Sequence, residues 1–249
     1  MIPKVNIIQG KVKDYIGVLE IVILSDNMFK ERSLARYPKL KEILKKSKNK
    51  KEDLILFFEN FEKENKDKLI GSSEKIKKAW APLNDRIMNI LEEIHEIKWT
   101  KKHSNFTARF TLSPVQPRYL DYNTFDIFYK DSKKEIIDTF LHELSHFIFF
   151  EKLKEVYPKI NSKEFEQPHL IWKMSEIMPG IILQDKKIQN IFKNKKLSVH
   201  DNIKKIRIGK KLILDILQDF YNKRKDFKDF IKKSYSFIKE YQEEIDKQF

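Results

Sequence analysis

Apolar residues recur at helical intervals through the first hundred residues of the chain. Residues 39–46 and 52–62 each predict a helix, and a lysine-rich stretch separates them. A longer helical pattern covers residues 72–97. Pro82 lies inside it and predicts a kink or a restart, because proline cannot donate the hydrogen bond that continues a helix.

The start of the chain fits two interpretations. Short apolar runs at residues 5–8 and 18–24 are compatible with strands. Residues 12–25 fit a single helix equally well. The pattern leaves both alternatives open.

Two segments in the middle of the chain have the period of β-strands. Apolar and polar side chains alternate over residues 106–112 and again over 125–129, with Pro114 and Pro117 between them. We expect these strands to pair, and one of them to form the edge of a small sheet.

Helices are predicted for most of the second half. The apolar positions of residues 135–154 cover so much of the helix circumference that a buried helix is expected. Pro168 suits the first turn of a further helix, which the Pro-Gly pair at residues 179–180 should end. Apolar stripes at residues 206–220 and 227–245 predict two amphipathic helices.

Together these segments predict an α+β fold that is mostly helical, with a small sheet preceding the helix at residues 135–154. We expect a mostly helical N-terminal region over residues 1–104. Residues 105–249 should form a core that contains the sheet, the buried helix and the C-terminal helices. The chain has 249 residues, of which 41% are apolar, enough to bury such a core.

The composition favours a cytoplasmic protein. No run of about twenty apolar residues is present, so a membrane span is not expected. The N-terminus lacks the pattern of an export signal. The chain has no cysteine, which excludes disulfide bonds and thiolate chemistry.

The formal net charge of +14 raises the question of nucleic-acid binding. Only seven of the 51 basic residues are arginine, the residue best suited to reading bases and clamping phosphates. The charge is uneven, since residues 186–249 hold 18 basic and 9 acidic side chains. Lysine mixed with glutamate on helices is usual for a solvated face, so nucleic-acid binding is an alternative and not the favoured function.

Residues 142–146 read His-Glu-Leu-Ser-His, the H-E-x-x-H pattern of zinc peptidases. Residues four apart on an α-helix are rotated by about 40° and separated by about 6 Å, so His142 and His146 project from one face and can bind one metal ion. Glu143 then stands beside a metal-bound water and can act as its general base.

The alternative to a metal site is a buried helix whose histidines meet ordinary polar partners. Two histidines and a glutamate inside the apolar run at residues 140–150 would be costly to bury. A Zn²⁺ ion bound by the two neutral imidazoles would offset that cost. We therefore expect one Zn²⁺ per chain.

With strands ahead of the motif helix, residues 106–183 resemble the zincin metallopeptidases, in which a strand lies above the H-E-x-x-H helix. The metzincin pattern continues with a glycine and a third histidine, but Phe149 and Lys152 stand at those positions. The gluzincin pattern takes a glutamate from a later helix. This resemblance implies a zincin-like catalytic core with Glu176 as the third zinc ligand.

Other residues compete for roles at this centre. Apolar neighbours of Glu176 predict a buried helix, where a carboxylate needs a cation. His169 lies two turns earlier on about the same face and is the main alternative ligand, so at most one of the two should reach the metal directly. His200 is a weaker candidate. Zincins add a tyrosine or histidine that donates to the developing oxyanion, and His169 and Tyr157 lie between the metal motifs.

The sequence therefore predicts a zinc-dependent metallopeptidase that hydrolyses peptide bonds in a peptide or protein substrate. An extended substrate would add to the strand near residues 125–130. Two alternatives are a regulator that cleaves one protein partner through the same site, and a basic nucleic-acid-binding protein in which the motif is inactive. A closed structural zinc site with four protein ligands is a third.

Overall fold

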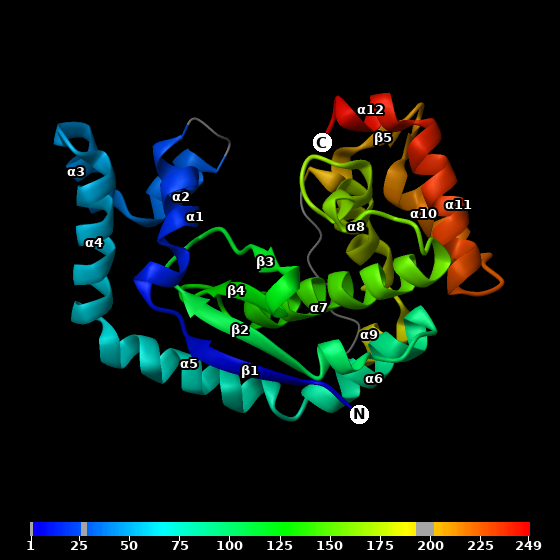
Figure 1. Cartoon of the computed structure of the whole chain (residues 1–249), viewed down its shortest axis with the longest axis horizontal. Helices are drawn as coiled ribbons and strands as arrows, with labels where there is room; N and C mark the ends of the chain where they lie inside the picture. Colours follow the sequence, from blue (N-terminus) through cyan, green and yellow to red (C-terminus); the bar gives the residue numbers. More distant parts are fainter. Residues whose placement is uncertain (1, 26–28, 193–201) are drawn as a thin grey trace. The chain divides into compact units, whose positions relative to one another are not determined.

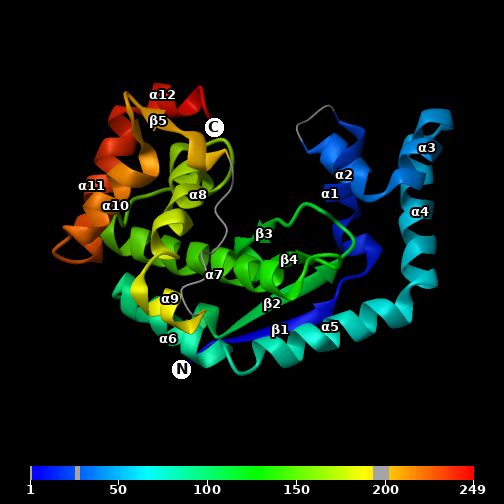
Figure 2. The same ribbon diagram turned by 180° about the vertical axis from the view of Figure 1, so that it is seen from behind.

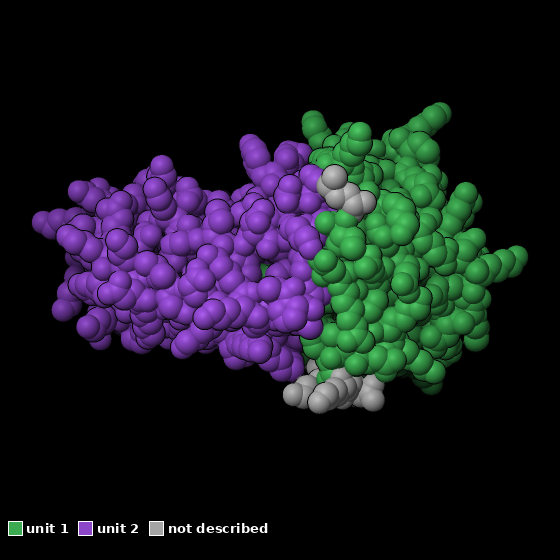
Figure 3. Space-filling model, turned by 90° about the horizontal axis from the view of Figure 1, so that it is seen from below, with its two compact units in different colours: residues 1–2, 85–102, 140–249 green, residues 3–84, 103–139 purple. Residues whose placement is uncertain are grey.

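The chain folds into two compact units whose segments alternate along the sequence (Figure 3). The computed structural model describes residues 2–25, 29–192 and 202–249. What we call the sheet unit comprises residues 3–84 and 103–139. What we call the helical unit comprises residues 1–2, 85–102 and 140–249. The fold is mostly helical with a small mixed sheet, so the α+β prediction holds at this level.

The predicted division into residues 1–104 and 105–249 does not match these units. Strand β1 (Lys4–Gln9) pairs in parallel with β2 (Asn105–Thr111), which joins the start of the chain to its middle. Pairing between strands a hundred residues apart leaves no trace in a local hydrophobic pattern. The compact units are therefore divided at other positions than residue 104.

The sheet has the order β1-β2-β4-β3. Strand β4 (Thr124–Phe128) runs parallel to β2, so the predicted pairing of these two segments is confirmed. The short strand β3 (Arg118–Tyr119) is antiparallel to β4 and covers its other side at Thr124 and Phe125. The edges are therefore β1 and β3, and the expectation that β2 or β4 would form an edge was wrong.

Five helices complete the described part of the sheet unit between β1 and β2. They are α1 (Val12–Leu24), α2 (Lys30–Arg36), α3 (Pro38–Lys46), α4 (Lys50–Glu64) and α5 (Lys66–Trp80). Helix α5 runs beside β1, as Figures 1 and 2 show from opposite sides. The start of the chain contains both a strand and a helix. Strand β1 covers the predicted strand at residues 5–8, and α1 matches the helix predicted for residues 12–25 in place of a second strand.

The long helical pattern around Pro82 is divided as expected. Helix α5 ends at Trp80, and α6 (Asn84–His95) begins after a short turn. The Asn84 side chain accepts hydrogen bonds from the Trp80 indole (3.1 Å) and the Val5 amide (3.1 Å) and donates to the Pro3 carbonyl (2.8 Å). The restart is thus tied to β1 by a buried asparagine.

A buried ion pair lies between the central strands of the sheet. Arg109 on β2 and Asp126 on β4 are cross-strand neighbours. Asp126 is 0% exposed and accepts two hydrogen bonds from the Arg109 guanidinium, at 2.7 and 3.2 Å. The Tyr119 hydroxyl donates a third at 3.2 Å. Burial raises the pKa of Asp126 above its ordinary value, although Arg109 acts in the opposite direction.

The helical unit contains the long motif helix and the C-terminal elements. Its described elements after α6 are α7 (Lys133–Val156, from Phe140 onward), the 3-10 turn Ser162–Phe165, α8 (Leu170–Ile182), α9 (Lys186–Ile191), β5 (Arg207–Ile208), β6 (Lys211–Leu212), α10 (Ile213–Asn222), α11 (Phe227–Glu240) and α12 (Gln242–Asp246). Helix α8 packs against α10, α11 and the 3-10 turn. The apolar side chains of α7 from Phe140 to Ile148 are at most 2% exposed, so the predicted buried helix is confirmed.

Three local predictions in this unit were wrong. Pro168 precedes α8 and is not in its first turn, because His169 is the N-cap. The pair at residues 179–180 does not end α8, since a proline in the last turn removes only one helical hydrogen bond and the surrounding side chains are buried. Residues 207–212 form a hairpin around Gly209, and α10 begins only at Ile213.

Within the three described stretches, none of the helices combines the length and the apolar character that a bilayer crossing requires.

Candidate metal centre

Helix α7 brings two imidazole rings together. His142 and His146 lie one turn apart, and their Nε2 atoms are 2.9 Å from each other. His146 is 0% exposed, whereas the His142 side chain is 12% exposed. No glycine or proline interrupts α7, and the buried Ser145 hydroxyl donates to the His142 carbonyl at 2.7 Å, so the helix stays regular through the motif. The periodicity of the helix therefore produces the predicted pair.

Helix α8 supplies a carboxylate to the same point. The Glu176 Oε2 atom is 3.6 Å from His142 Nε2, and its Oε1 atom is 3.8 Å from His146 Nε2. Glu176 is 12% exposed and belongs to a helix whose neighbouring positions Ile177 and Met178 are fully buried. One ligand atom from each of the three residues lies within 4.8 Å of the others. The structure thus joins the three residues singled out in the sequence.

The separations of these donors fit a tetrahedral ion. Two ligand atoms at roughly 2.0–2.1 Å from a tetrahedral Zn²⁺ are about 3.3 Å apart. The two Nε2 atoms are 2.9 Å apart, and each is 3.6 or 3.8 Å from a different oxygen of the Glu176 carboxylate, which brackets that value. Two imidazoles and one carboxylate are also a donor set of catalytic zinc sites, in which three protein ligands leave a fourth position for water. The three side chains therefore offer a donor set that suits Zn²⁺, with one ligand atom from each within 4.8 Å of the others.

Glu143 lies beside the cluster and outside it. It follows His142 on α7 and is 6% exposed. Since an α-helix turns by about 100° per residue, its side chain leaves the helix in a different direction from the two histidines. It is not one of the three converging residues. A buried carboxylate next to a metal ligand suits proton transfer better than coordination.

Two phenylalanine rings form a stacked row with the His146 ring. The Phe150 ring lies nearly parallel to the His146 ring, with centroids 6.3 Å apart and planes at 18°. Phe165 from the 3-10 turn stacks on Phe150 at 4.3 Å and 16°. The two rings form an apolar wall beside His146, which is 0% exposed. Sequence reasoning missed both rings, although Phe150 stands one helical turn after His146.

The alternative candidates lie elsewhere. His169 is exposed at the N-cap of α8, and its Nδ1 atom is 3.0 Å from the Glu166 carbonyl. Tyr157 follows the end of α7 and packs its ring against Tyr235 at 5.2 Å. At 1.5 Å per residue, His169 is about 10 Å along α8 from Glu176, and Tyr157 is about 16 Å along α7 from His146.

Neither His169 nor Tyr157 therefore joins the three converging donors. Of the two alternatives for the third ligand, Glu176 lies with the histidines and His169 does not. We do not assign either residue an oxyanion role. His200, the weaker candidate, lies outside the described residues.

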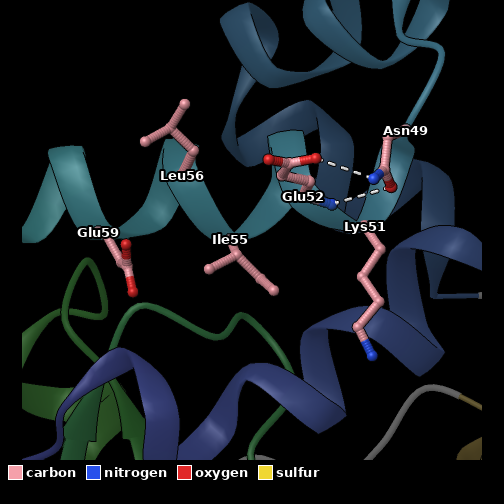
Figure 4. Close-up of a pocket in the computed structure, with 6 residues that line it drawn as sticks. All are labelled: Asn49, Lys51, Glu52, Ile55, Leu56 and Glu59. Carbon is pink, nitrogen blue, oxygen red and sulfur yellow. Dashed lines mark hydrogen bonds between the residues drawn. The ribbon is translucent and has the colours of Figure 1, made fainter.

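A surface hollow beside α4 in the sheet unit has a different character (Figure 4). Its lining comes from α4 and the residue before it. Asn49 donates to the Glu52 carboxylate at 2.9 Å, and Ile55 lies between that pair and Glu59. The hollow contains no histidine and none of the predicted site residues, so it contributes nothing to the metal chemistry.

Comparisons with protein-family models, with curated proteins and with solved structures found no match to this chain. The converging donors on α7 and α8 are therefore the observations from which a function follows.

Proposed function

We propose that the chain is a zinc-dependent metallopeptidase. The observation that carries this proposal is the convergence of His142 and His146, expected from the spacing of the motif, with Glu176, implied by the gluzincin resemblance, within 4.8 Å of one another. A five-residue motif can arise by chance. The approach of a third donor from a separate helix to the same point is much harder to explain as coincidence.

Each residue has a distinct part in the proposed reaction. His142 and His146 would hold the ion through their Nε2 atoms, and Glu176 would contribute a carboxylate oxygen. Zinc held there supplies a bound water with a pKa of about 7 and polarises a peptide carbonyl. Glu143 accepts a proton from the attacking water and passes it to the amide nitrogen as the C–N bond breaks, which leaves a carboxylate and an amine.

The number of converging donors is that of a catalytic zinc site. Among the described residues, the cluster contains three His, Asp or Glu donors, and a fourth such ligand is not part of it. Three protein ligands leave a position for water, whereas a structural zinc site is closed by four. A regulator that cleaves a single protein partner would use the same centre and the same base, so it is a narrower form of this proposal.

The order of strands in the sheet changes the expected position of the peptide substrate. Residues 125–130 were expected to form an edge to which an extended peptide adds. Phe125 on β4 is paired with β2 on one side and with β3 on the other. The amide of the next residue, Asp126, donates to the Pro117 carbonyl at 3.0 Å. The side of β4 that was expected to bind the peptide is therefore covered by β3 at Thr124 and Phe125. We do not place the substrate there.

Zinc binding tests the proposal directly. The purified chain, supplied with zinc and dialysed, is expected to retain about one zinc per molecule by elemental analysis. His146→Ala and Glu176→Gln should each weaken zinc binding by at least about 100-fold, because the loss of a direct ligand exceeds the 10–100-fold cost of losing a supporting residue. Competition with a chromophoric chelator measures the affinities.

His169→Ala is the matched control, because it removes an imidazole that is exposed and lies outside the cluster. It should bind zinc as the wild type does. Wild-type protein that binds no zinc would contradict the proposal, and so would a His169→Ala variant that loses zinc as completely as His146→Ala.

A further inference from the structure

The positive charge of the C-terminal quarter is concentrated in one short segment. Residues 186–212 contain ten lysines and arginines and a single acidic residue, Asp201. Residues 213–249 contain eight basic and eight acidic residues. The whole excess of positive charge in this region therefore precedes α10. Such a segment differs from a solvated helical face, on which basic and acidic residues are mixed evenly.

The described end of this segment is a fixed β-hairpin. Strands β5 and β6 are joined by Gly209 and Lys210, and Gly209 has φ +57°, a conformation that favours glycine at the first position of a two-residue turn. Gln248 holds the hairpin by accepting from the Arg207 amide at 2.9 Å and donating to its carbonyl at 2.8 Å. The hairpin lies beside α12 (Figure 1).

In this segment the charged side chains are exposed and the isoleucine side chains are buried. Residues 204–211, which we call the basic hairpin, comprise the end of the 3-10 turn Ile203–Lys205 and the hairpin that follows it. They carry five exposed cations: Lys204, Lys205, Arg207, Lys210 and Lys211. Ile206 and Ile208 are buried beneath them at 1% and 8% exposure. In the part of the chain that the structure describes, no ion pair engages Lys205, Arg207, Lys210 or Lys211. Their charge is therefore available to an anionic partner.

The chemistry of the basic hairpin favours phosphates over a protein or a membrane. Protein interfaces are depleted in lysine and centred on apolar or aromatic side chains, which the hairpin keeps buried. Membrane-surface elements also present apolar residues to the acyl chains. Lysine is a hydrated point charge that binds phosphate without reading bases.

We propose that the basic hairpin docks the chain on double-stranded DNA through phosphate contacts that carry no base specificity. A two-stranded β-ribbon fits the major groove of B-DNA, whereas the deep and narrow major groove of A-form RNA does not admit it. This inference is independent of the zinc site, because the hairpin and the cluster share no residue.

DNA binding by the full chain tests the inference. Fluorescence anisotropy with a labelled duplex of about twenty base pairs should show binding that weakens steeply between about 50 and 200 mM salt, because counterions are released. The triple variant Lys205→Gln, Lys210→Gln and Lys211→Gln should bind at least about ten-fold more weakly. Its slope of log affinity against log salt should fall by about three, one for each lost phosphate contact.

A control variant separates the hairpin from net charge. Lys228, Lys232 and Lys239 are exposed on α11 and form no ion pair among the described residues. Replacing these three by glutamine removes the same charge and should leave DNA affinity within about two-fold. Arginine at the three hairpin positions should retain binding, which guards against a folding defect.

Several results would overturn the inference. These are no DNA binding by the wild type, equal losses in the hairpin and control variants, and binding to anionic lipid vesicles or double-stranded RNA at least as tight as to DNA. Zinc content is measured on the same samples. If the hairpin variant keeps its zinc while losing DNA, the two proposals have been tested separately.

Discussion

Replacement of Glu143 by glutamine is expected to reduce peptide hydrolysis by about 10²–10⁴-fold, the contribution of a general base. Glutamine keeps the size of the side chain but cannot accept a proton from the attacking water. The protein should still bind one zinc, because Glu143 lies outside the converging ligands. Turnover of casein and of a quenched fluorescent peptide library, with zinc content measured in parallel, provides the readout.

Glu240→Gln makes the same chemical change at an exposed position at the end of α11 and should retain wild-type turnover. Glu143→Gln protein with full activity would exclude the proposed base. Loss of zinc together with activity would instead make Glu143 a residue that holds the centre. A wild type that binds zinc but turns over neither probe would contradict a general peptidase and favour the form dedicated to one protein partner.

The sequence singled out the three converging residues because they are local to one helix or chemically distinctive. His142 and His146 lie in a strongly helical segment, so their relative position follows from helix geometry alone. Glu176 came from the resemblance to gluzincins. The Phe150 and Phe165 wall was missed because Phe165 reaches it from an irregular turn, and tertiary packing of that kind has no periodic signal.

The fold was predictable where an element is long and wrong where an element is short or pairs at a distance. Strands β3 and β5 have two residues each, too few to show an alternating pattern. Strand β1 pairs with β2, so residues 3–84 belong to the same unit as the central strands. The local pattern of apolar residues contains no sign of such a distant pairing. Pro179 lies inside α8 close to its end, where proline removes a single backbone hydrogen bond, so the helix continues past it.

Arg109→Met is expected to lower the free energy of unfolding by about 3–5 kcal/mol, because it leaves the buried Asp126 carboxylate without its cation. For a chain of this size, the melting temperature should fall by about 6–20 °C. Arg32→Met, an exposed arginine in α2, is the control and should change stability by less than about 0.5 kcal/mol. Thermal and urea unfolding monitored by circular dichroism measure both.

The double variant Arg109→Met with Asp126→Asn isolates the buried charge as the cause. It removes both charges, keeps an acceptor for the Tyr119 hydroxyl, and should recover most of the stability lost in Arg109→Met. If the double variant is as unstable as the single one, lost packing of the arginine stem is the cause instead.

Acid should also relieve the defect of the single variant. The pKa of Asp126 in the folded protein is already raised by burial, and removing Arg109 raises it further, because Arg109 acts to lower it. The folded state then binds the proton more tightly than the unfolded chain, whose aspartate pKa is about 3.9, so stability increases as the pH falls through the raised pKa. The stability difference between Arg109→Met and wild type should therefore shrink from pH 7 toward about pH 4. A difference that stays constant over that range would mean that removing Arg109 does not raise the pKa of Asp126 and that the carboxylate stays charged in the folded variant.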